Sequence, residues 1–161
     1  MKRNLISTSA LNQLQQFGAV VLNSSSALSS QGMTIGVGNG ASPEVFATIT
    51  EVKGIDGPGG QTAEIDVTDL SSTAKEFVLG LQDEGDISLD MNYIPSNTQH
   101  ALLRTLRGSG AENNFRITFT DSPATTWTFG ARVKGFSLSN AVDNVTQLSV
   151  VLRVTGSITE A

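Results

Sequence analysis

The sequence contains few residues capable of catalytic chemistry. The chain has 161 residues, no cysteine and a single histidine, His100. Thiolate nucleophiles, disulfides, cysteine-ligated zinc and any two-histidine metal site are therefore excluded. His100 falls in the first turn of an expected helix, and no motif supplies the nucleophile and the orienting acid that a catalytic triad needs. We therefore interpret His100 as a surface or subunit-contact residue and expect no enzyme activity.

Two further patterns imitate ligand sites. The segment from Gly36 to Gly40 has three glycines, but Ser42, Pro43 and another strand follow where a phosphate loop needs a helix N-terminus. The acids between Asp83 and Asp90 offer oxygen ligands for calcium without the spacing of an EF-hand. We interpret the first as a turn and the second as a solvated strand face, and we expect no cofactor and no metal.

The negative charge of the chain is concentrated in one segment. The net charge is −5, whereas residues 64–90 alone hold eight acids against Lys75, a balance of −7. Phosphate contacts need lysine and arginine, so this acidic domain is a poor candidate for specific nucleic-acid binding. No apolar run approaches the roughly 18–20 residues of a membrane helix, so we expect no membrane insertion.

The first 31 residues differ in composition from the rest. Leu11, Leu14 and Val21 recur at helical spacing, and a serine-rich run follows at 24–30. We expect residues 1–31 to form an arm outside the β domain. Three interpretations of this arm stay open: a disordered tail, a weakly docked helix, or a segment that is ordered by a neighbouring subunit. Polar residues interrupt the apolar stretch, so a signal peptide is disfavoured. Residues 32–161 form the expected β domain.

From residue 32 onward the hydrophobic period is two, which predicts strands. Between Asp86 and Tyr93 the alternation is complete: Ile87, Leu89, Met91 and Tyr93 share an apolar face, and a wet face holds Asp86, Ser88, Asp90 and Asn92. Long strands are predicted at 114–120, 126–138 and 144–156, with a β-bulge near Gly135. Shorter strands are predicted at 33–38, 45–52 and 64–68.

One helix interrupts the strands. Ser96 and Gln99 have the spacing of a capping box, Leu102, Leu103 and Leu106 form an apolar stripe, and Gly108 suits the C-terminal cap. The fold class is therefore mainly β, an antiparallel β-sandwich or barrel with one flanking α-helix at about residues 97–107.

A long inter-strand loop is expected at about residues 54–85. It begins with a turn that we interpret as a flexible hinge, Gly57, Pro58, Gly59 and Gly60. It ends with a group of apolar residues, Phe77, Val78, Leu79 and Leu81. Connections of this length are usually functional. Two interpretations stay open: these residues cap the core of the monomer, or they anchor the loop on another subunit.

A family resemblance rests on residues 73–106. Residues 76–88 follow the pattern E-F-x-x-G-L-x-D-x-G-x-x-S, and Asn92-Tyr93-Ile94-Pro95 and the predicted helix come after it. This arrangement resembles the major tail tube proteins of long, non-contractile-tailed bacteriophages, the lambda-like tail tube family. That family is related to the tube protein of type VI secretion.

The resemblance implies a structural subunit that self-assembles into stacked, hexameric rings, the conduit for DNA delivery in the virion tail. It implies synthesis in the host bacterial cytoplasm, and tape-measure, tail terminator and tail-tip proteins as partners. In such a tube, the apolar residues Phe77, Val78, Leu79 and Leu81 would contact the next ring. The wet face of residues 86–92 would line the lumen, where DNA passes without specific binding, although an outward orientation is equally allowed.

Two alternatives to a phage tail tube remain. A type VI secretion or tailocin tube protein would share both fold and assembly. A surface- or carbohydrate-binding β-sandwich is more distant, because it would expose aromatic residues along a groove. The nine aromatic residues of this chain lie mainly on the apolar faces of the predicted strands.

Overall fold

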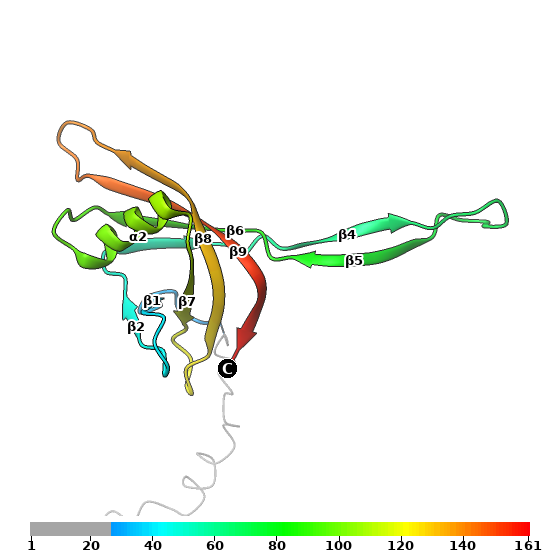
Figure 1. The fold of residues 1–161 in the computed structure, drawn as a ribbon, viewed down its shortest axis with the longest axis horizontal. Helices are drawn as coiled ribbons and strands as arrows, with labels where there is room; N and C mark the ends of the chain where they lie inside the picture. Colours follow the sequence, from blue (N-terminus) through cyan, green and yellow to red (C-terminus); the bar gives the residue numbers. More distant parts are fainter. Residues whose placement is uncertain (1–26) are drawn as a thin grey trace, which may run out of the picture.

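The computed structural model describes residues 27–161, which form one curled antiparallel sheet, one helix and one projecting hairpin (Figure 1). Most of the predicted arm at 1–31 lies outside the described residues. The seven-stranded sheet has the order β2-β1-β7-β8-β9-β6-β3, and β4 and β5 pair separately. The elements are β1 Thr34–Gly38, β2 Phe46–Thr48, β3 Val52–Asp56, β4 Gln61–Asp66, β5 Phe77–Asp83, β6 Asp86–Asn92, α2 Thr98–Ser109, β7 Glu112–Thr118, β8 Thr126–Ser139 and β9 Gln147–Glu160.

The sheet curls into a half-barrel because its two edge strands are consecutive in the chain. β2 and β3 lie at opposite edges, yet only residues 49–51 connect them. A connection of this length spans at most about 14 Å. The predicted mainly β fold is confirmed, in the form of one curled sheet.

The core lies on the concave face of the half-barrel. The predicted alternation is confirmed on β6, where Ile87, Leu89 and Met91 are buried and the residues between them are partly or fully exposed. Buried residues of the other strands include Ile35, Val37, Phe115, Ile117, Phe129, Leu148, Val150 and Leu152. The register of β8 against β9 shifts between Val133 and Gly135, which confirms the predicted bulge. The bulge restores Phe136 to the inner side, where it meets Tyr93 edge to face.

The helix is confirmed, but both of its predicted caps are displaced. Its N-cap is Asn97, not Ser96, and the Asn97 side chain accepts hydrogen bonds from the backbone N–H groups of Gln99 and His100 at 2.8 and 3.2 Å. The Asn97 amide also donates to Thr50 Oγ1 at 2.8 Å, a contact from a distant segment that fixes its orientation. The helix passes through Gly108 and ends at Gly110, which has φ 66°. The left-handed conformation that ends the helix is therefore adopted by Gly110 and not by Gly108, the glycine expected from the sequence.

The expectation that His100 lies at the surface is wrong. Its side chain is 1% exposed, Nδ1 accepts from the backbone N–H of Ile94 at 3.2 Å, and Nε2 lies 3.1 Å from the carbonyl oxygen of Thr50. Because Nδ1 is an acceptor, Nε2 carries the proton and donates to Thr50. His100 thus joins the start of the helix to the connection between the sheet edges.

Two predicted segments are divided differently in the structure. The expected strand at 45–52 is two strands, β2 and β3, because the backbone turns at Glu51, which has φ 65°. The expected loop at 54–85 is largely the β4–β5 hairpin, and the strand expected at 64–68 is β4, at 61–66. Within residues 27–161, no helix is long and apolar enough to cross a membrane.

Candidate assembly surface

The β4–β5 hairpin extends away from the half-barrel (Figure 1). It carries apolar side chains that are exposed to solvent. Leu81 is 88% exposed and Leu79 is 68% exposed. The other exposed large apolar residues of the hairpin and its turn are Ile65, Val67, Leu70, Phe77 and Val78. A cluster of exposed apolar side chains marks an interaction site. The interpretation that residues 77–81 cap the core of the monomer is therefore wrong.

Both faces of the hairpin are apolar. Val78 lies opposite Ile65, so these two side chains share one face. Leu79 lies opposite Glu64 on the other face. The predicted contact residues are thus divided, since Val78 points away from Phe77 and Leu79. A two-stranded ribbon with both faces in water is marginally stable at best, so this hairpin is suited to being covered by another chain.

The turn at the end of the hairpin is ordered by its own polar side chains. Asp69 Oδ1 accepts from the backbone N–H groups of Ser71 and Ser72 at 2.7 and 3.1 Å. The hydrogen bonds from the Ser71 hydroxyl and from the Ser71 N–H lower the pKa of Asp69. Thr68 Oγ1 accepts from the backbone N–H of Glu76 at 3.0 Å. These bonds present Leu70, at the tip, directly to solvent.

The predicted hinge lies at the base of the hairpin, where the chain leaves β3 and enters β4. Gly57 has φ 105°, and a Cβ placed there would lie 2.5 Å from the carbonyl oxygen of Asp86. On the returning strand Gly85 has φ 76°, and its Cβ would lie 2.6 Å from the carbonyl oxygen of Gly59. The two crossing segments therefore approach so closely that only glycine fits at these positions.

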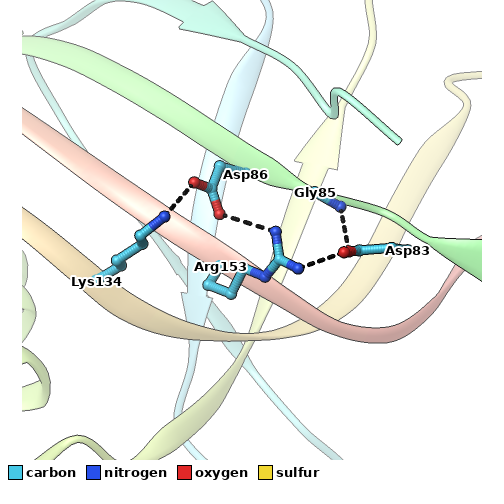
Figure 2. Close-up of polar contacts among 5 residues, drawn as sticks. All are labelled: Asp83, Gly85, Asp86, Lys134 and Arg153. Atoms are coloured by element: carbon cyan, nitrogen blue, oxygen red, sulfur yellow. Dashed lines mark hydrogen bonds and ion pairs between the residues drawn. The ribbon is translucent and has the colours of Figure 1, made fainter. Parts of the chain in front are cut away.

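A chain of ion pairs spans the same junction (Figure 2). Arg153 on β9 binds Asp83, the last residue of β5, and also Asp86, the first residue of β6. Lys134 on β8 binds the second oxygen of Asp86 at 2.7 Å. The bond from the Gly85 N–H and the nearby Arg153 lower the pKa of Asp83. The bonds from Lys134 and Arg153 lower the pKa of Asp86, so both carboxylates are ionised at neutral pH.

The predicted wet face is one part of a wider polar surface. On β6, Asp90 lies beside Ser149 of β9, which lies beside Ser137 of β8. In the next row Asn92 is followed by Gln147 and Ser139. A hollow of about 330 Å³ lies over this surface, lined in part by Lys53, Asp90, Ser137, Ser139, Gln147 and Ser149. Hydroxyl and amide groups therefore dominate, and the acid at position 86 is paired with two cations.

Sequence reasoning found only part of the exposed hairpin surface. It identified Phe77, Val78, Leu79 and Leu81 but missed Ile65, Val67 and Leu70. The alternation over 64–68 was a usable signal, because it placed Ile65 and Val67 on one face of a strand. Within residues 27–161, no three acidic or histidine side chains are grouped so as to hold a metal ion.

One family model matches the chain, and it covers residues 26–146. Its description is "Phage tail tube, TTP, lambda-like". A comparison with curated proteins gave no match.

Solved structures with the same fold come from several tubular assemblies. A chain from the tail of an empty gene transfer agent particle, refined with C6 symmetry, has a TM-score of 0.68 at 14% identity and covers 84% of this chain and 99% of its own. A chain of the sheath–tube complex of the PVC extracellular contractile injection system scores 0.65 at 15% identity, covering 98% and 99%. The SPP1 tail tube scores 0.62 at 10% identity, covering 83% and 78%.

Proposed function

Because the chain belongs to the lambda-like phage tail tube family and is a structural subunit of the tube, we propose that its β4–β5 hairpin joins successive rings. The exposed apolar residues on both faces of this hairpin carry the proposal. The half-barrel already has a core of its own, so the hairpin is surplus to the folding of the monomer. A projection that docks on a different surface of the next copy makes a heterologous contact, which generates open filaments.

Within a ring, we propose that neighbours pair through the sheet edges. β2 and β3 are the edges of the seven-stranded sheet, and each pairs on one side only within the described residues. Unpaired backbone groups at such an edge are a template for another strand. We propose hexameric rings, supported by the sixfold symmetry of the gene transfer agent tail.

We propose that Asp86, Ser88, Asp90 and Asn92, with the neighbouring serines of β8 and β9, line the lumen. Hydroxyls and amides, with few free cations, do not hold phosphates by counterion release, so DNA passes without specific binding. This role requires no cofactor and no enzyme activity. We expect synthesis in the host bacterial cytoplasm, before assembly into the virion.

The partners that we propose are the tape-measure, tail terminator and tail-tip proteins. Two solved structures with the same fold support contacts at the tube ends, since one is from the baseplate of the anti-feeding prophage and the other is from the cap that terminates its tube. The tape-measure protein is proposed as a partner only because the chain is a tube subunit.

The second candidate is the tube of a contractile injection system or tailocin. The observation that favours it is the alignment over 98% of this chain with a chain of a sheath–tube complex. A sheath gene beside the coding gene would support this candidate, and a tape-measure gene without a sheath gene would support the non-contractile tail.

The inter-ring contact is tested by electron microscopy of the purified protein after negative staining. We expect tubes from the wild-type chain and no tubes from Leu79→Asp, because a carboxylate there prevents burial of the hairpin. The matched control is Gln82→Asp, which adds the same charge to β5 without removing an apolar side chain, and we expect it to form tubes. Normal tubes from Leu79→Asp would contradict the proposal.

A further inference from the structure

Strand pairing is interrupted at the base of the hairpin. The β3–β6 ladder ends at Asp56 and Ser88, and the β4–β5 ladder resumes in the same register at Gln61 and Asp83. Among residues 27–161, β4 and β5 pair only with each other, and the chain enters and leaves the half-barrel through residues 57–60 and 84–85. One backbone bond, from the Val154 N–H to the carbonyl oxygen of Gly85 at 3.1 Å, holds the returning strand to β9. The ladder has no pairs across this glycine-containing break, where the ribbon can bend, so a further contact there helps to set a single direction.

We propose that Arg153 is a positioning residue that sets the direction of the hairpin by binding Asp83 on the hairpin side and Asp86 on the sheet side (Figure 2). This inference rests on the proposed inter-ring role of the hairpin, because a fixed direction matters only if the hairpin must meet another copy.

The geometry at Arg153 suits this task. Its backbone is paired with Asp86 in the β6–β9 register, so the guanidinium group starts from a fixed position. Nη1 lies 3.3 Å from Asp86 Oδ1, and Nη2 binds Asp83 Oδ2. The other carboxylate oxygen of Asp83 accepts from the Gly85 N–H at 2.9 Å. The two prongs of one planar group therefore join two segments on either side of the turn.

The acidic residues around the junction also favour a link through a positively charged side chain. Asp83, Glu84 and Asp86 are close in sequence and lie at the end of the most acidic segment of the chain. Without Arg153, the carboxylates of Asp83 and Asp86 would repel each other across the turn. Arg153 thus supplies an attraction and removes a repulsion between the hairpin and the sheet.

Lys134 provides a matched comparison. Its ion pair in the described part of the chain is with Asp86, at 2.7 Å, so it belongs to the sheet side of the network. Removing Lys134 takes away one positive charge of the cluster while the link from Arg153 to the hairpin stays intact. If charge alone mattered, the two substitutions would act alike.

The experiment measures the hairpin direction in the full-length subunit, below the concentration at which tubes form. Because the chain has no cysteine, Ser71→Cys at the hairpin tip and Thr105→Cys on α2 give two unique sites for spin labels. Pulsed electron spin resonance then reports the distribution of distances between them. We expect Arg153→Gln to broaden this distribution roughly twofold, and Lys134→Gln to leave it as in the wild type.

Asp83→Asn is the second variant, because it removes the same link from the exposed hairpin side and leaves Arg153 in place. We expect it to broaden the distribution as Arg153→Gln does. Unchanged widths in both variants would overturn the positioning role of Arg153. Equal broadening by Lys134→Gln would also overturn it, in favour of a general effect of charge.

Tube formation by the same variants separates this inference from the proposed function. We expect Arg153→Gln to raise the concentration needed for tubes roughly fivefold, since each hairpin must then be ordered on docking. Broadened hairpins that form tubes at the wild-type concentration would overturn the role of Arg153 in assembly. The proposed inter-ring contact has a separate test, because normal tubes from Leu79→Asp would contradict it whatever the result for Arg153.

Discussion

The half-barrel and the hairpin have similar alternating sequences, but their apolar side chains are buried in the half-barrel and exposed in the hairpin. Leu89 on β6 is 0% exposed, whereas Leu81 on the preceding strand β5 is 88% exposed. Both are leucines in antiparallel strands, and the ion-paired turn between β5 and β6 separates them. Alternation predicts a strand with an apolar face, but it does not say which molecule covers that face. In the half-barrel the chain covers itself, and in the hairpin the apolar residues remain for another copy.

The largest difference between the two regions is expected from matched truncations. Leu89→Ala should lower the free energy of unfolding by about 2–5 kcal/mol, because it opens a cavity in the core. Leu81→Ala should change it by less than about 0.5 kcal/mol, because nothing in the monomer packs on it. Urea unfolding of the unassembled subunit measures both. Similar decreases in the free energy of unfolding for the two variants would contradict the distinction between the core of the half-barrel and the exposed surface of the hairpin.

A second comparison sets His100 against Asp69, which each bind two backbone groups. His100→Ala should destabilise the subunit by about 1–3 kcal/mol, because it empties the space of a buried side chain and removes its hydrogen bonds to Ile94 and Thr50. Asp69→Ala should have a much smaller effect, since water replaces the lost bonds at the exposed turn. Thermal unfolding followed by circular dichroism compares the two, and the reverse ranking would contradict the account.

The helix cap sharpens the comparison within the half-barrel. Asn97→Ala should cost about 1 kcal/mol, because its side chain caps the helix and also binds the connection between the sheet edges. Ser96→Ala is the control, and we expect no measurable change from it. If Ser96→Ala lowered the free energy of unfolding more than Asn97→Ala in chemical unfolding, Ser96 would be the N-cap, as the sequence predicted.

The smallest effect is expected on acidification. Hydrogen bonds and cations lower the pKa of Asp83 and Asp86 below the ordinary value of 3.8. Their contribution is therefore complete above that value and is lost as the pH falls through the lowered pKa. The distance distribution of the spin-labelled hairpin should stay constant down to about pH 3.8 and broaden only below it. Broadening in neutral or mildly acidic buffer would show that these carboxylates do not hold the hairpin.

Local patterns predicted the sheet well and its closure poorly. The alternation on β6, the bulge at Gly135 and the helix follow from residues close in sequence. The burial of His100 depends on Thr50, and the separation of β2 from β3 depends on the backbone at Glu51. Contacts between residues about fifty positions apart leave no signature in a local period, so His100 was assigned to the surface.

The candidate site was predicted in outline for a similar reason. The sequence pattern located the apolar residues of β5, but a strand register is needed to show that Ile65 shares a face with Val78. Arg153 lies 67 positions from Asp86, so its place at the hairpin base follows only from the pairing of β6 with β9. The direction of the wet face in a tube depends on the neighbouring subunits, which a single chain does not contain.

The central claim, that the β4–β5 hairpin is covered by a subunit of the next ring, is tested most directly by a cryo-electron microscopy reconstruction of tubes assembled from this chain. The account predicts that Ile65, Phe77, Leu79 and Leu81, exposed in the subunit, are buried against a neighbouring ring. A tube in which these side chains remain in solvent, and in which the rings meet through other surfaces, would contradict it.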